Sequence, residues 1–182
     1  MAYEHIWING DAGIYTQLTT TSATGLPAEM FVPVPASGLA TGGGASTLDL
    51  QTGKAVALDH FYTGWRIKIV AGTSKGEERV VRAYTAANLR CTVDAWATTT
   101  DNTSRYVISP PVEGLQLQEI IMEATGQSVL WLLTGGTPTS SLGHLSAAGD
   151  RLHLRGGINT LRNFRVIDGS GAAAVHVTGI YG

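Results

Sequence analysis

The sequence predicts an all-β protein, and three observations lead to this fold class. Charged residues make up 14% of the 182 residues, whereas about 25% is usual for a soluble domain. Glycine and threonine are abundant, and they favour turns and strands respectively. Apolar and polar residues alternate in several short stretches, and no stretch has a convincing helical period with caps, 115–124 being the nearest candidate. We expect antiparallel sandwich or barrel-like modules of short strands, preceded by an extended N-terminal arm.

Residues 1–46 form the least regular region. Apolar residues alternate with prolines in 27–35, a pattern that favours extended, edge-like chain. Glycines gather in 37–46, a composition typical of a flexible connector. Two interpretations remain open: the region is an arm that docks on a partner, or it is a peripheral strand and loop packed on its own domain. On the first interpretation, the partner contacts come from Trp7, Met30, Phe31, Val32 and Val34.

The clearest strand pattern lies in residues 47–112. Apolar residues alternate strictly in Trp65–Ile69, and a glycine-bounded turn at 72–76 leads into a return strand. The strands that we expect here are 65–69, 77–84, 89–94 and 105–108. Two prolines stop the last of them. The sequence therefore predicts a small antiparallel β domain that ends near residue 112.

Residues 113–182 have the pattern of a second β domain. Polar and apolar residues alternate cleanly in Arg151–Arg155, and glycine pairs mark the turns. The strands that we expect here are 128–133, 151–155, 163–167 and 173–180. The domains predicted from sequence are thus the arm and connector (1–46) and two β domains (47–112 and 113–182).

Charge and cysteine content narrow the possible partners and compartments. Twelve basic and 14 acidic residues give a net charge of -2, which argues against a nucleic-acid binder. The single cysteine, Cys91, excludes an intrachain disulfide. It falls on the apolar face of an alternating stretch, so we expect a buried core residue. No signal peptide or membrane-spanning stretch is visible, so we expect a soluble protein made in the cytoplasm, without membrane contact.

The motifs that usually indicate catalysis or cofactor binding do not occur. The five histidines have no metal-binding spacing, and no nucleophile elbow is present. The turn at 72–76 leads into Glu77 and Glu78, which would repel phosphate, so it is not a phosphate loop. We expect no enzymatic activity, no metal or other cofactor and no small-molecule ligand. A small hydrolase remains an alternative, because a β fold could bring two of the scattered carboxylates together.

The tryptophans divide between core and loop positions. Trp65 and Trp131 lie in strongly apolar stretches and are expected in the core. Trp96 lies in a loop, where it either packs the loop or offers a platform for a sugar ring.

A set of aromatic, glycine and polar residues is spread over residues 60–108 with a recognisable spacing. It reads as an aromatic-Gly strand, a Gly-x-x-x-Gly turn, a return strand ending at Tyr, then Val-Asp-x-x-Trp and Ser-x-Tyr. The positions are Tyr62, Gly64, Gly72, Gly76, Arg79, Tyr84, Val93, Asp94, Trp96, Ser104 and Tyr106. This stretch resembles a small β module of virion structural proteins of tailed bacteriophages. Residues 113–182 are similar in style to jelly-roll-like domains of head-decoration and fibre-associated proteins.

The resemblance implies a non-enzymatic bacteriophage structural protein that decorates or cements the capsid exterior. Its implied partners are the major capsid protein and copies of itself, as a homotrimer. Its implied location is the virion surface, after synthesis in the host cytoplasm. Two alternatives within a particle remain: a tail, neck or fibre component involved in host receptor binding, and a joining or completion protein.

Overall fold

The computed structural model describes residues 13–168 and 173–182, and it confirms the all-β fold class. The elements of the first half are β1 (Gly13–Thr19), η1 (Ala28–Met30), β2 (Ala36–Leu39), β3 (Gly42–Gly44), β4 (Thr47–Asp49), β5 (Arg66–Ala71), β6 (Glu78–Thr85), η2 (Ala86–Asn88) and β7 (Arg90–Val93). Those of the second half are β8 (Arg105–Ser109), β9 (Leu117–Thr125), β10 (Val129–Leu132), β11 (His144–Ser146), β12 (Arg151–Arg155), α1 (Gly157–Leu161), β13 (Arg165–Asp168) and β14 (Ala174–Tyr181). No helix among these is long and apolar enough to cross a membrane.

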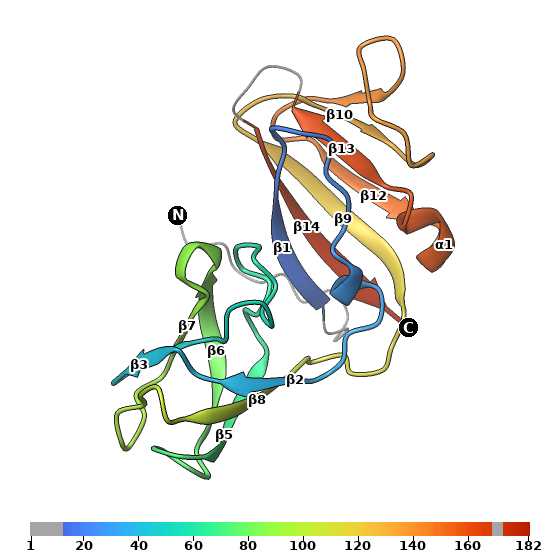
Figure 1. Ribbon diagram of the computed structural model, residues 1–182. Helices are drawn as coiled ribbons and strands as arrows, with labels where there is room; N and C mark the ends of the chain where they lie inside the picture. Colours follow the sequence, from blue (N-terminus) through green and yellow to red (C-terminus); the bar gives the residue numbers. More distant parts are fainter. Residues whose placement is uncertain (1–12, 169–172) are drawn as a thin grey trace.

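The strands form two lobes (Figure 1). The first lobe contains a seven-stranded antiparallel sheet in the order β2-β8-β5-β6-β7-β4-β3. Its two outermost strands, β2 and β3, are separated in the chain by only Ala40 and Thr41. The sheet therefore curls until its ends meet, and the lobe is barrel-like. Alternate side chains of β5, Ile67 and Ile69, point into the core and are fully buried.

The second lobe is a sandwich of two sheets. One sheet has the order β1-β14-β9-β12, and the other has the order β11-β10-β13. Alternate residues of β14, among them Val175 and Val177, fill the core between the sheets. The stretch 115–124, the nearest helical candidate, lies largely in strand β9. Burial of Ile120, Met122 and Ala124 follows the period of two that a strand requires.

The region expected as an arm is divided between the two lobes. Strand β1 pairs along its whole length with β14 of the second lobe. Strands β2 and β3 belong to the sheet of the first lobe. Residues 13–46 thus pack on their own chain, as the second interpretation of this region predicted. Trp7 lies outside the described residues.

Glycines in the expected flexible connector serve close packing. A Cβ atom on Gly43 would lie 2.4 Å from the Thr100 hydroxyl and 2.7 Å from the Thr100 backbone. On Gly38 it would lie 2.6 Å from the Tyr106 hydroxyl. Glycine is favoured at both positions, because the Thr100 backbone and the Tyr106 ring occupy the space that a side chain would need.

Two linkers join the lobes, and they run side by side. The N–H of Leu117 donates to the carbonyl of Phe31 at 3.0 Å, and the N–H of Gly114 donates to that of Pro33 at 3.2 Å. Tyr181, in the last strand, donates its hydroxyl to the carbonyl of Met30 at 2.8 Å. The connection is therefore a hydrogen-bonded pair of chain segments rather than a single strand of linker.

Candidate functional site

Two tyrosines of the residue pattern in 60–108 hold one loop of the first lobe. The Tyr62 hydroxyl accepts the N–H of Val56 at 3.1 Å, and the Tyr84 hydroxyl donates to the Val56 carbonyl at 2.8 Å. Their rings meet edge to face, with centroids 4.9 Å apart. Burial raises the pKa of Tyr62 to about 12 and also raises that of Tyr84. Both rings are neutral structural groups at physiological pH.

Other positions of the pattern fix the turns. Gly72 has φ of +78°, and a Cβ there would lie 2.0 Å from the carbonyl oxygen of Thr103. The Ser104 hydroxyl donates to the carbonyl of Thr73 at 2.9 Å. The Tyr106 hydroxyl accepts the N–H of Gln51 at 3.0 Å. These residues pin the β5–β6 turn and β4's following loop to the strand around residue 106.

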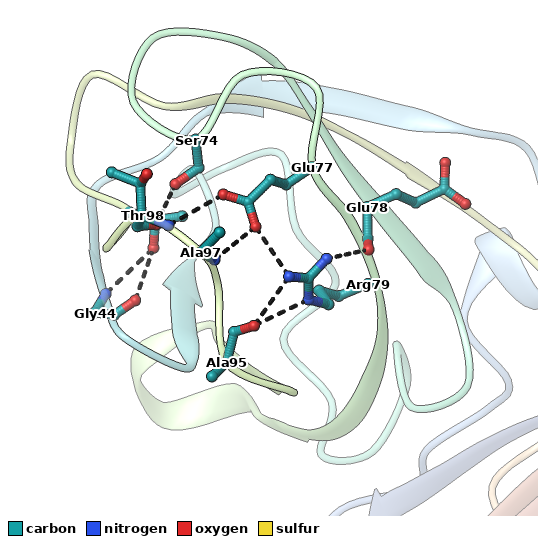
Figure 2. Close-up of polar contacts among 9 residues, drawn as sticks. Gly44, Ser74, Glu77, Glu78, Arg79, Ala95, Ala97 and Thr98 are labelled. Atoms are coloured by element: carbon teal, nitrogen blue, oxygen red, sulfur yellow. Dashed lines mark hydrogen bonds and ion pairs between the residues drawn. The ribbon is translucent and has the colours of Figure 1, made fainter.

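Glu77 and Arg79 clamp the loop after β7 (Figure 2). The Glu77 carboxylate accepts the N–H groups of Ala97 at 2.8 Å and Thr98 at 3.2 Å, and it pairs with Arg79 at 2.9 Å. These backbone hydrogen bonds, followed by the Arg79 charge, lower the pKa of Glu77. Arg79 also donates to the carbonyl of Ala95 at 3.0 and 3.1 Å. The carboxylate is thus committed to holding the loop in place.

Trp96, which the sequence left as either packing residue or sugar platform, packs the clamped loop. Only 6% of its surface is exposed. The guanidinium carbon of Arg79 lies 5.4 Å from the centroid of its ring, so the ring face is covered. Trp65 and Cys91 lie in the core as predicted, whereas Trp131 is only partly buried and packs against the core. Burial raises the pKa of the Cys91 thiol, so it is unreactive.

The outer surface of the first lobe carries a shallow, open depression of about 350 Å³. Its lining residues are Arg66, Glu78, Arg79, Val80, Arg82 and Asp94. Arg82 and Asp94 pair at 2.8 Å, and this hydrogen bond is the main reason for the lowered pKa of Asp94. The Asp94 carboxylate is therefore ionised and has no proton to donate to a substrate. The depression is open, so it does not enclose a ligand.

The open face of the four-stranded sheet carries the densest set of titratable groups in the second lobe. Glu119 pairs with His153 at 2.5 Å and with Arg155 at 3.3 Å, and Glu123 pairs with Arg151 at 2.9 Å. Four residues along one strand place the Cα atoms of Glu119 and Glu123 about 13 Å apart. Each carboxylate is engaged by basic side chains of the neighbouring strand β12. No group of three or more His, Cys, Asp or Glu among residues 13–168 and 173–182 could hold a metal ion.

The predicted partner-contact residues separate into buried and exposed positions. Met30 and Phe31 are 0% and 7% exposed, so they pack in the core of their own chain and cannot form the surface of an arm. Val32 and Val34 are 37% and 60% exposed on the first linker. Leu115, on the paired linker, is 44% exposed. Sequence reasoning missed Leu115, because the alternation around it suggested a strand or a helix. We call Val32, Val34 and Leu115 the linker patch.

Comparisons with known proteins give no relative for this chain. No family model, no curated protein and no solved structure matches it.

Proposed function

We propose that the protein is a non-enzymatic structural component of a tailed-bacteriophage virion and that it decorates the capsid exterior. The first support comes from the structural roles of the residues that carry the resemblance. Gly72, Tyr84, Trp96, Ser104 and Tyr106 pack the core or fix turns. A module whose distinguishing residues hold its own fold together supplies a stiff scaffold rather than a reaction.

The linker patch is the observation that carries the proposal. Its three aliphatic side chains are exposed on two linkers that are hydrogen-bonded to each other. Such a patch is already ordered, so little conformational entropy is lost when a partner covers it. A weak contact of this kind is sufficient for a shell protein, because the symmetry of the shell repeats it many times. The partners that we propose are the major capsid protein and further copies of this chain.

A binding experiment with matched variants tests the shell contact. The double variant Val32→Ser, Val34→Ser removes most of the exposed apolar surface of the patch. We expect it to bind particles lacking the protein about tenfold more weakly, which corresponds to about 1.4 kcal/mol. Cosedimentation with such particles measures this. The control Val70→Ser, Val80→Ser changes two valines of similar exposure, 42% and 38%, on β5 and β6.

Three results would bear on the proposal. Loss of binding by the linker variant alone, with an unchanged melting temperature, supports the patch as the shell contact. Equal binding by both variants would contradict it. Gold-labelled antibody found on the tail or neck instead of the head would contradict capsid decoration and favour the receptor-binding alternative.

A further inference from the structure

The sheet ends of the first lobe are protected. An uncovered strand edge is a template for another strand, and proteins cover or charge such edges. The side chain of Gln51 accepts the N–H of Leu39 in β2 at 3.2 Å. The Thr100 hydroxyl bonds both the N–H and the carbonyl of Gly44 in β3, each at 3.2 Å. Neither end of this sheet is therefore a free template.

Three of the four sheet edges in the second lobe are protected as well. The N–H of Gln17 in β1 donates to the carbonyl of Asp59 at 3.2 Å. Val166 in β13 exchanges two hydrogen bonds with Thr24, at 2.8 and 2.9 Å. The edge strand β12 carries an arginine at each end, Arg151 and Arg155, and charged edges resist pairing.

Strand β11 is the exception within the described parts of the chain. It pairs with β10 on one side, and no described segment covers its other side. Leu145 in the strand is 69% exposed, and Leu142, in the loop before it, is 58% exposed. Residues 124–149 contain no Asp, Glu, Lys or Arg. The edge thus has neither a cover nor a charge to keep another strand away.

The face beside this edge is aliphatic. Leu130 of β10 lies opposite Leu145 on one side and opposite Ile167 of β13 on the other. Directly opposed residues share a face of a sheet. None of the three belongs to the buried core cluster, so the row lies on the outer face. Its most exposed member, Leu145, stands at the open edge.

We propose that β11 pairs antiparallel with β11 of a second copy of this chain, on a two-fold axis at Leu145. Antiparallel pairing of identical strands is self-complementary, as a two-fold contact requires. The uncharged stretch presents no like charges to an identical partner. The pairing joins two three-stranded sheets into one and makes the aliphatic row continuous across the axis. The occupant of the edge is therefore another copy.

The strand edges favour a dimer over the trimer that the resemblance implies. A ring of three needs a head-to-tail contact between two different surfaces. For strand pairing, that means a second edge that is both uncovered and uncharged, and the described residues offer none besides β11. The two-fold contact leaves the linker patch unused, so shell binding and dimer formation can succeed or fail separately.

Sedimentation velocity of the full chain and two charge variants tests the dimer. The wild-type chain is expected at twice its 19.1 kDa mass. Leu145→Arg and Leu145→Glu are each expected to be monomeric, because like charges meet across the axis. An equal mixture of the two is expected to recover dimers, since Arg then faces Glu. Leu115→Arg, which adds the same charge on the linker patch, is the control and is expected to stay dimeric.

Several results would overturn the contact. They are a monomeric or trimeric wild-type chain, a dimeric Leu145→Arg chain, and a mixture that stays monomeric although both variants fold. Circular dichroism melting establishes whether the two Leu145 variants fold. If Leu145→Arg fails to fold, the wild-type mass and the Leu145→Glu mass still decide the question. Shell binding by a monomeric wild-type chain would leave the proposed function standing and remove the dimer.

Discussion

Gly72 shows how a single position can determine a turn. The sequence identified it as one end of a Gly-x-x-x-Gly turn, and the structure gives two reasons for glycine there. The backbone has positive φ, and the carbonyl of Thr103 occupies the place of a side chain. Only the first reason could be predicted from the sequence, because Thr103 lies on a segment that is brought near only by folding.

Alanine substitutions separate these two reasons. In Gly76→Ala only the φ of +93° is unfavourable, because nothing lies within 4 Å of the added Cβ. We therefore expect the free energy of unfolding to fall by about 1 kcal/mol. Gly72→Ala also meets the Thr103 carbonyl, so the expected loss is at least about 2 kcal/mol. Urea denaturation of the two variants measures both. Equal losses would show that the Thr103 contact costs little.

Among the elements, strands with strict alternation could be predicted, and long-range pairings could not. The expected strand 151–155 coincides with β12, and 65–69 overlaps β5. Pairing of β1 with β14 joins the two ends of the described chain. Local periodicity carries no signal for such a partner. For the same reason the sequence suggested an arm in the region that contains β1, which is an edge strand of the second lobe.

The clamped loop after β7 allows a test of one element with a neighbouring control. Glu77→Gln weakens the hydrogen bonds to the N–H groups of Ala97 and Thr98, so we expect these amides to exchange at least about tenfold faster. Hydrogen exchange measured by NMR gives the rates. Glu78→Gln is the control, because Glu78 only faces Arg66 at 3.6 Å on the surface. Unchanged protection in Glu77→Gln would show that the clamp is not needed.

The clamp also predicts a pH dependence. The pKa of Glu77 is lowered in the folded state, so its contribution is present above the ordinary value of 4.5. It is lost as the pH falls through the lowered pKa. In acid, the wild-type loop should therefore approach the exchange rates of Glu77→Gln. A difference between the two proteins that stays constant until acid unfolds the whole protein would contradict this.

The contact between the lobes is the main feature at the scale of the whole molecule. Tyr15 of β1 lies between His60 of the first lobe and His176 of β14, with ring centroids 5.4 and 5.6 Å away. The Tyr15 hydroxyl is hydrogen-bonded to Nδ1 of His176. Burial, followed by the nearby His60, lowers the pKa of His176, while Glu123 opposes the shift. This cluster could not be predicted from the sequence, because its members come from three distant segments.

Stability should therefore fall in mild acid. Below the ordinary histidine pKa of 6.5, the unfolded chain takes up a proton at His176 that the folded chain resists. The free energy of unfolding then decreases as the pH falls, until the folded-state pKa is passed. Thermal melting of wild type and His176→Gln at pH 7.5 and 5.5 measures this. The variant should lose less stability than wild type over this range. Equal losses would contradict a role for His176.

Copy number in purified particles tests the central claim, capsid decoration, most directly. Quantitative mass spectrometry of virions compares the amount of this chain with that of the major capsid protein. We predict a copy number comparable with that of the capsid protein, because a decoration protein occupies sites that repeat over the whole shell. A copy number that is a small fraction of it, as for a tail, neck or joining component, or absence from the particle, would contradict the account.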